Sequence, residues 1–262
     1  MDFTLYWFMF PVSIGVATCA MLSGIGGAAL FTPIFILIFP LLGPEYVLES
    51  TVAAIGTALL TQTFGFTSGF VGYYRKGTID FGLALQFLRI AVPVAILGAF
   101  TAHLVHEGLL IAAYAVLVFI LALVLIFVRK QATADHGASS FVITGIGAFL
   151  TGMVSVGIGE VIISQLTRRG VPVAIAAATS VAVVIVTVAC ASITQIVQLI
   201  REGGVTAVPW HLVFYTIPGV IIGGQIGPRM QGRVAQRTME SAIGILFIIL
   251  AIAMLFVALR KF

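Results

Sequence analysis

The chain has 262 residues, of which 61% are hydrophobic and only 8% are charged, whereas a soluble domain carries about 25% charged residues. A chain of this length cannot hide so much apolar surface from water, so the composition predicts an all-α polytopic membrane protein. The formal net charge of +4 does not indicate nucleic-acid binding, because the basic residues stand at the ends of apolar runs, as topology signals do. No Cys/His spacing indicates a metal or a cofactor.

Apolar runs follow one another along the whole chain, and most exceed the roughly 20 residues that a helix needs to cross the hydrocarbon core. They are residues 5–39, 47–73, 81–104, 108–128, 141–166, 173–200, 206–228 and 239–259. The first run is interrupted by SGIGG at 23–27, and the fifth by SVGIGE at 155–160. Glycine-rich breaks in corresponding segments of two halves indicate the binding site of a transporter.

The two halves of the chain correspond in sequence order. GIGGAALFTP at 24–33 matches GIGEVIISQL at 157–166, and GTA at 56–58 matches ATS at 178–180. We interpret this as an internal duplication of about 130 residues. It predicts one membrane domain made of a first repeat, 1–132, and a second repeat, 133–262.

The positive charges test whether segments 5–39 and 141–168 are straight spans or hairpins bent at their glycines. Straight spans divide the flanking Lys and Arg seven against five, whereas hairpins divide them nine against three, the stronger asymmetry. In the hairpin topology the nine are Arg75, Lys76, Arg129, Lys130, Arg168, Arg169, Arg229, Arg233 and Arg237, and the three are Arg201, Arg260 and Lys261. Hairpins make the halves inverted repeats, each a glycine-broken helix hairpin plus three transmembrane helices. Both termini then lie outside a bacterial inner membrane.

The two breaks predict an anion site. A helix that begins after a glycine break exposes unpaired amide groups and a partial positive charge, and two related breaks would direct two such ends at one central point. Close helix packing is the alternative role for these glycines. The candidate substrate-binding residues are Gly24, Ile25, Gly26, Gly27, Ala28, Thr57, Gln62, Gly157, Ile158, Gly159, Glu160, Gln165, Thr179, Ser180 and Gln195.

Glu160 stands where the first half has Gly27. A carboxylate inside a membrane is costly and indicates a function. Protonated Glu160 would tolerate a neighbouring anion and ionised Glu160 would repel it, so it is the proton-coupling candidate; a structural role in the first helical turn is the alternative. Each hydroxyl or carboxamide among the candidates can be explained alone by an interhelical hydrogen bond, but together they are typical of a path lining.

The sequence resembles the TauE/SafE family of sulfite and sulfonate exporters. The resemblance rests on GIGGAALFTP at 24–33, GTALL at 56–60, SGFVGYYRKGTID at 68–80, GIGE at 157–160 and ATS at 178–180. It implies transport of a small anion. The chain departs from the family pattern at Ala28, Tyr73 and Glu160, where the family commonly has a third glycine, a nearby histidine and a glycine-rich second motif.

The function predicted is secondary transport of a sulfite, sulfonate or related sulfur oxyanion, in the direction of export. No GxxxxGK[ST] motif supplies nucleotide energy. The alternatives are an intramembrane enzyme, for which no nucleophile–base pair is found, and a channel or accessory subunit of a membrane complex. The predicted partners are the anion and the lipid bilayer, and a homo-oligomer is left open.

Overall fold

The computed structural model describes residues 3–23, 26–127, 137–230 and 236–261, and this part of the chain is helical throughout apart from short turns. The helices are α1 (Met9–Ser23), α2 (Ala28–Pro33), α3 (Phe39–Leu42), α4 (Thr51–Arg75), α5 (Phe81–Leu104), α6 (Glu107–Phe127), α7 (Gly137–Val154), α8 (Ile158–Arg168), α9 (Val173–Gly203), α10 (Trp210–Met230) and α11 (Gln236–Lys261). Short 3₁₀ turns cover Phe3–Tyr6, Pro44–Tyr46 and Val205–Ala207.

The first glycine break reverses the direction of the chain. After α1, the chain returns through α2, a π-helical segment (Ile34–Ile38) and α3. The ring of Tyr6 lies 5.6 Å from the ring of Phe39, so the beginning and the end of this segment are at the same end of the molecule. A Cβ placed on Gly27 would lie 3.3 Å from the Cβ of Ala20 in α1, which shows how closely the two arms approach.

The second break makes the same kind of reversal between α7 and α8. Ser155 and Gly157 both have positive φ, 67° and 135°, and these left-handed conformations turn the chain sharply. Near the open end of the hairpin, Arg169 donates a 2.7 Å hydrogen bond from Nη2 to the hydroxyl of Ser140. The hairpin prediction is therefore confirmed for both segments, and the straight-span alternative is wrong.

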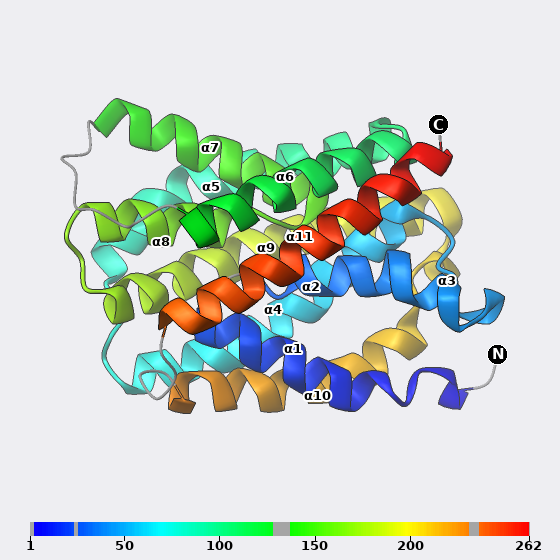
Figure 1. Ribbon diagram of the computed structural model, residues 1–262, viewed down its shortest axis with the longest axis horizontal. Helices are drawn as coiled ribbons and strands as arrows, with labels where there is room; N and C mark the ends of the chain where they lie inside the picture. Colours follow the sequence, from blue (N-terminus) through cyan, green and yellow to red (C-terminus); the bar gives the residue numbers. More distant parts are fainter. Residues whose placement is uncertain (1–2, 24–25, 128–136, 231–235, 262) are drawn as a thin grey trace.

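Both chain termini lie at one end of the helical bundle, which we call the terminal end (Figure 1). Basic residues at the opposite end are Arg75, Lys76, Arg168, Arg169 and Arg229, together with Arg237 at the start of α11, whereas Arg201, Arg260 and Lys261 lie at the terminal end. Arg129, Lys130 and Arg233 lie outside the described residues. This is the distribution that the hairpin topology predicts.

Small residues let several helix pairs approach at backbone distance. In the pair of α1 and α10, a Cβ on Gly223 would lie 2.4 Å from the carbonyl oxygen of Ile14. In the pair of α5 and α7, a Cβ on Gly152 would lie 2.0 Å from the carbonyl oxygen of Ala95. Such contacts are typical of helix association in lipid, where small residues at the interface permit close van der Waals packing.

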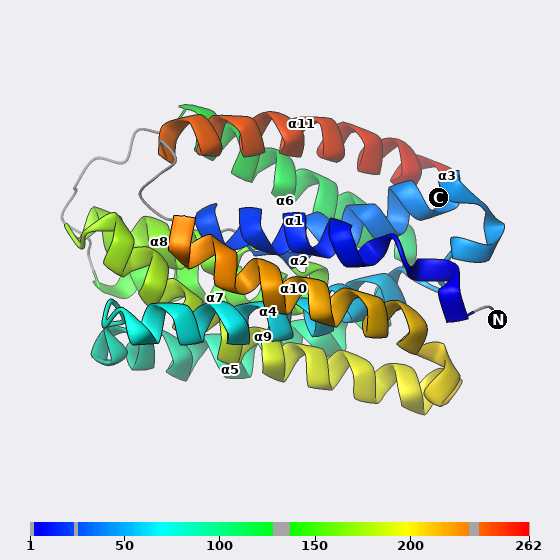
Figure 2. The same cartoon turned by 90° about the horizontal axis from the view of Figure 1, so that it is seen from below.

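The outer helices fit a membrane by length and composition. Among the described residues, α5, α6, α9 and the part of α11 from Ser241 to Lys261 are long and apolar enough to cross it. Helices α6 and α11 pack along each other and lie side by side at one edge of the bundle (Figure 2). The fold is that of a multi-pass helical membrane protein.

Candidate anion site at the two helix breaks

The first turn of α2 receives side chains from two other helices. The amide of Gly26 donates a 3.3 Å hydrogen bond to Oε1 of Glu160, which belongs to α8. The amide of Ala28 donates a 2.7 Å hydrogen bond to Oε1 of Gln62 in α4. Amide groups at a helix start have no partner within their own helix, and here acceptors from the other half and from a neighbouring helix fill that role.

The start of α8 is built around Gly157, whose φ of 135° is open to glycine alone among common residues. The amide of Ile158 donates a 2.7 Å hydrogen bond to the hydroxyl of Thr151 in α7. The Glu160 carboxylate, in the first turn, also lies against the backbone amides of Gly157 and of Glu160 itself. One carboxylate therefore contacts the first turns of both half-helices.

Glu160 thus stands at the point toward which both breaks direct their amide groups. Its Oε1 accepts the hydrogen bond from Gly26, while its Oε2 is buried and has no hydrogen-bond partner among the described residues. Two helix starts favour negative charge at this point. The carboxylate therefore lies where the sequence predicts the substrate anion.

Hydroxyl groups that sequence analysis missed connect the two breaks. Thr32 and Ser155 share a 2.7 Å hydrogen bond and are both fully buried. The hydroxyl of Tyr114 in α6 donates to the carbonyl oxygen of Ala29. Tyr114 could have been singled out, because it carries the one polar group of the apolar run 108–128.

The predicted site residues fall into two groups in the structure. Gly26, Gly27, Ala28, Gln62, Gly157, Ile158, Gly159, Glu160 and Ser180 lie at or against the breaks, with the Ser180 hydroxyl donating to the Gly159 carbonyl oxygen over 3.0 Å. Gly24 and Ile25 lie outside the described residues.

The other candidates have different partners. Gln165 is bonded to Ser140 near the start of α7, and the Thr179 hydroxyl accepts a 3.0 Å hydrogen bond from the amide of Asp80 before α5. Gln195 donates to the carbonyl oxygen of Gly152 over 3.1 Å. Thr57 is fully buried, and its hydroxyl has no hydrogen-bond partner in the described part of the chain.

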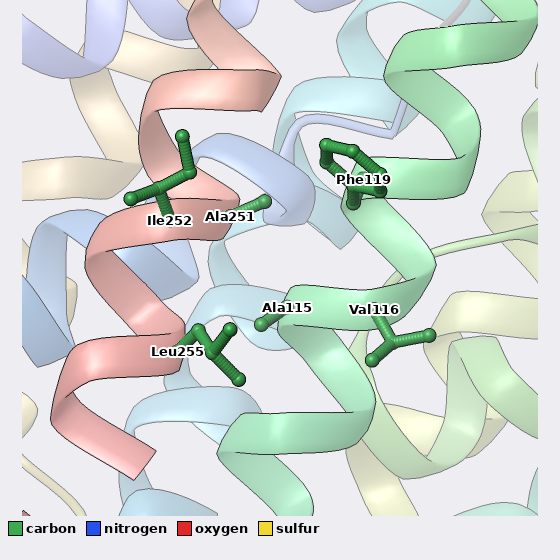
Figure 3. A pocket seen from close by; sticks show the side chains of 6 residues that line it. All are labelled: Ala115, Val116, Phe119, Ala251, Ile252 and Leu255. Carbon is green, nitrogen blue, oxygen red and sulfur yellow. The ribbon is translucent and has the colours of Figure 1, made fainter. Parts of the chain in front are cut away.

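An apolar groove between two outer helices is not a candidate anion-binding site. It has a volume of about 200 Å³, lies between α6 and α11, and is lined by Ala115, Val116, Phe119, Ala251, Ile252 and Leu255 (Figure 3). None of these side chains can donate a hydrogen bond. Among the described residues, no group of His, Cys, Asp and Glu side chains could hold a metal ion.

A multi-pass helical bundle in which two broken helices meet is an architecture of membrane transporters. The family model described as Sulfite exporter TauE/SafE matches residues 9–254, so the chain belongs to this family of membrane transporters and is not an enzyme. The chain is 26% identical over 242 residues to "Probable membrane transporter protein YjnA" of Bacillus subtilis (strain 168), covering 85% of this chain and 90% of that protein. No solved structure matches.

Proposed function

We propose that this protein exports a sulfite, a sulfonate or a related sulfur oxyanion across a bacterial inner membrane, with both termini outside. The single observation that carries the proposal is the meeting of the two breaks, where the Gly26 amide lies 3.3 Å from Oε1 of Glu160. This contact joins residues 134 positions apart in the chain. It supports a site at which one small anion would bond to the starts of both half-helices.

The chemistry of the site suits an anion that must bind and then leave. The donors are backbone amides of α2 and α8, and Gln62 adds a neutral carboxamide. Amides at helix starts stabilise negative charge without a full positive charge. A tetrahedral or pyramidal oxyanion offers several acceptor oxygens, so it can bond to both helix starts together.

Alternating access would follow from two inverted repeats, and the packing pattern supports this part of the proposal. Helix α1 packs on α10 and its counterpart α7 packs on α5, while α10 packs on α4 and α5 packs on α9. The remaining large contacts join helices that occupy matching positions in the two repeats, α4 with α9 and α6 with α11. A two-fold axis lying in the membrane plane would produce this exchange of partners.

Glu160 would couple the anion to a proton. In the ionised state its carboxylate accepts from the Gly26 amide and keeps a substrate anion away by charge and by occupancy. In the protonated state it loses its charge and can leave these amides to the substrate. A proton on Glu160 and an anion at the helix starts would therefore occur together. The alternative is a structural role, in which the carboxylate only caps the two helix starts.

The test is flux in liposomes loaded with sulfite or taurine, with and without a pH gradient, comparing the wild type, Glu160→Gln and the exposed control Glu49→Gln. We expect saturable export by the wild type and by Glu49→Gln, stimulated by the gradient, and export by Glu160→Gln that no longer responds to it. Equal gradient responses in all three proteins would remove the coupling role. Absence of flux for every small anion would remove the transport proposal, and non-saturating flux would favour the channel alternative.

A further inference from the structure

A second polar cluster surrounds His103, which lies at the C-terminus of α5, at the terminal end of the bundle. Its Nε2 lies 2.8 Å from Oε1 of Gln195, and its Nδ1 lies 3.1 Å from both carboxylate oxygens of Glu202. The side chain of His103 is only 2% exposed, whereas that of Glu202 is 59% exposed. The cluster therefore leads from the surface of the protein to the buried carboxamide of Gln195 in α9.

The orientation of the Gln195 carboxamide follows from its other partner. Its nitrogen lies 3.1 Å from the carbonyl oxygen of Gly152, which can only accept a hydrogen bond. The amide nitrogen must therefore face Gly152, and the amide oxygen must face His103. An oxygen at that position can only accept, so Nε2 of His103 must carry a proton.

The other ring nitrogen needs a proton as well. Nδ1 faces the carboxylate of Glu202, and an ionised carboxylate only accepts hydrogen bonds. Satisfying both contacts therefore requires the imidazolium form of His103. When the ring loses one proton, either the contact with Glu202 is lost, or the Gln195 carboxamide turns over and loses Gly152.

Through Gln195, these contacts hold the end of α7, which comes directly before the second break. Gly152 is three residues before Ser155, whose positive φ begins the turn. Its neighbour Thr151 accepts the hydrogen bond from the amide of Ile158 at the start of α8. A bond that holds the Gly152 carbonyl oxygen therefore also holds the residues on which the α8 start rests.

The charged surroundings of the ring are few. The described helix α7 carries no titratable side chain, and α9 carries Cys190, Arg201 and Glu202. Helix α5 adds Arg89, and the turn after it adds His106 and Glu107. Of these groups, Glu202 contacts the His103 ring. Histidine is the side chain whose charge commonly changes between about pH 5 and 8.

We propose that His103 is a pH-dependent positioning residue for the second helix break. Its imidazolium joins Glu202 and Gln195, and through Gln195 it fixes the end of α7 and the amides at the start of α8. Loss of the Nε2 proton lets the Gln195 carboxamide turn over and release the Gly152 carbonyl oxygen, which loosens the break and weakens anion binding. This proposal concerns regulation of the same site and rests on the proposed function.

Two measurements test the proposal without substrate. The first is ¹⁵N NMR of histidine-labelled protein in nanodiscs, with the His103 signal assigned through His103→Gln. We expect both ring nitrogens protonated at pH 6; a ring with one protonated nitrogen at pH 6 would overturn the proposal. Because the chain has four histidines, the His103 signal can also be assigned by elimination through His106→Gln, His136→Gln and His211→Gln, so the measurement on the wild type remains decisive where a His103 variant fails to fold.

The second measurement is hydrogen exchange of residues 151–160, corrected for the intrinsic effect of pH. We expect protection in the wild type to fall by about fivefold from pH 6 to pH 8, as for loss of the hydrogen bond between the neutral Gln195 carboxamide and the Gly152 carbonyl oxygen. His103→Gln should show no such fall, and the control His211→Gln should behave as the wild type. An equal fall in His103→Gln and the wild type, or none in the wild type, would contradict the proposal.

Flux then separates this inference from the proposed function. We expect the KM for the anion to rise with pH on the side that Glu202 faces, and His103→Gln to lose that part of the rise while retaining kcat. A protein with pH-dependent protection that carries no anion would refute only the proposed function. A protein that carries anions with pH-independent protection would refute only the role of His103.

Discussion

The hydrogen bond between Thr32 and Ser155 offers a direct test of how firmly the two breaks are joined. The oxygens are 2.7 Å apart, the side chains are 0% and 1% exposed, and the residues belong to different halves. Thr32→Val and Ser155→Ala each remove one partner and leave the other hydroxyl buried without it. Each single change should cost about 1 kcal/mol or somewhat more.

A double-mutant cycle isolates the energy of the pair. The φ of 67° at Ser155 imposes similar strain on Ser and Ala, so this term cancels between the two arms of the cycle. Interhelical hydrogen bonds in membranes have coupling energies averaging about 0.6 kcal/mol and reaching about 1.7 kcal/mol. For a short, fully buried pair, we expect a value in the upper half of that range.

The assay is the free energy of unfolding in bicelles for the wild type, the two single variants and the double variant. The double variant should be destabilised by less than the sum of the single changes. Strict additivity, within about 0.3 kcal/mol, would show that the two hydroxyls do not stabilise each other. The two breaks would then be held together by contacts other than this hydrogen bond.

Three further predictions concern other described residues. Gly152→Ala should strongly reduce the yield of folded protein in a detergent solubility assay, because the new Cβ would lie 2.0 Å from a backbone oxygen. The control Gly145→Ala, in the same helix, should be tolerated, because its Cβ would meet nothing nearer than 3.9 Å. Equal yields of the two variants would contradict the packing of α5 against α7. Tyr114→Phe should lower thermal stability by the equivalent of about 1 kcal/mol, since the Ala29 carbonyl oxygen loses its donor, and an unchanged melting temperature would contradict this contact. Thr57→Val should leave stability unchanged or raise it, because the lost hydroxyl is buried and has no hydrogen-bond partner in the described part of the chain. A fall in flux without a fall in stability would identify Thr57 as part of the anion path. A fall in stability would show that the hydroxyl has a hydrogen-bond partner and would contradict the prediction.

The sequence was sufficient to predict the helical hairpins and the end of the bundle at which each described basic residue lies. Both predictions rest on long-range averages: run lengths limit the number of spans, and the distribution of Lys and Arg discriminates between topologies. The repeat also predicts that the two breaks approach each other, and the contact of Gly26 with Glu160 shows them together. Patterns spread over many residues are robust to the details of any one side chain.

The partners of individual polar residues could not be predicted in the same way. Gln165 and Gln195 both stand in apolar runs, yet one binds Ser140 at the start of α7 and the other links Gly152 to His103. The helical period shows which residues share a face, but not which neighbouring helix that face meets. The same limit applies to Glu160, which accepts a hydrogen bond from Gly26 in the other half.

A glycine in the sequence does not by itself predict a helix break, because glycine has two structural roles in this protein. A glycine can open the backbone, as Gly157 does with its φ of 135°, or it can admit a neighbouring helix, as Gly152 and Gly223 do. The sequence shows a glycine in both cases and does not distinguish the two roles. The two breaks were distinguishable because they recur at matched places in the two halves.

We propose that the starts of α2 and α8 bind an oxyanion at the position of the Glu160 carboxylate. The most direct measurement is the crystallographic position of selenite, an anomalously scattering analogue of sulfite, in the protein soaked at a pH that protonates carboxyl groups. We expect an anomalous peak within hydrogen-bonding distance of the Gly26 amide, with the Glu160 carboxyl group displaced from it. A peak confined to the surface arginines Arg168 and Arg169, with Glu160 still bound to Gly26, would show that the two helix starts do not form the anion site.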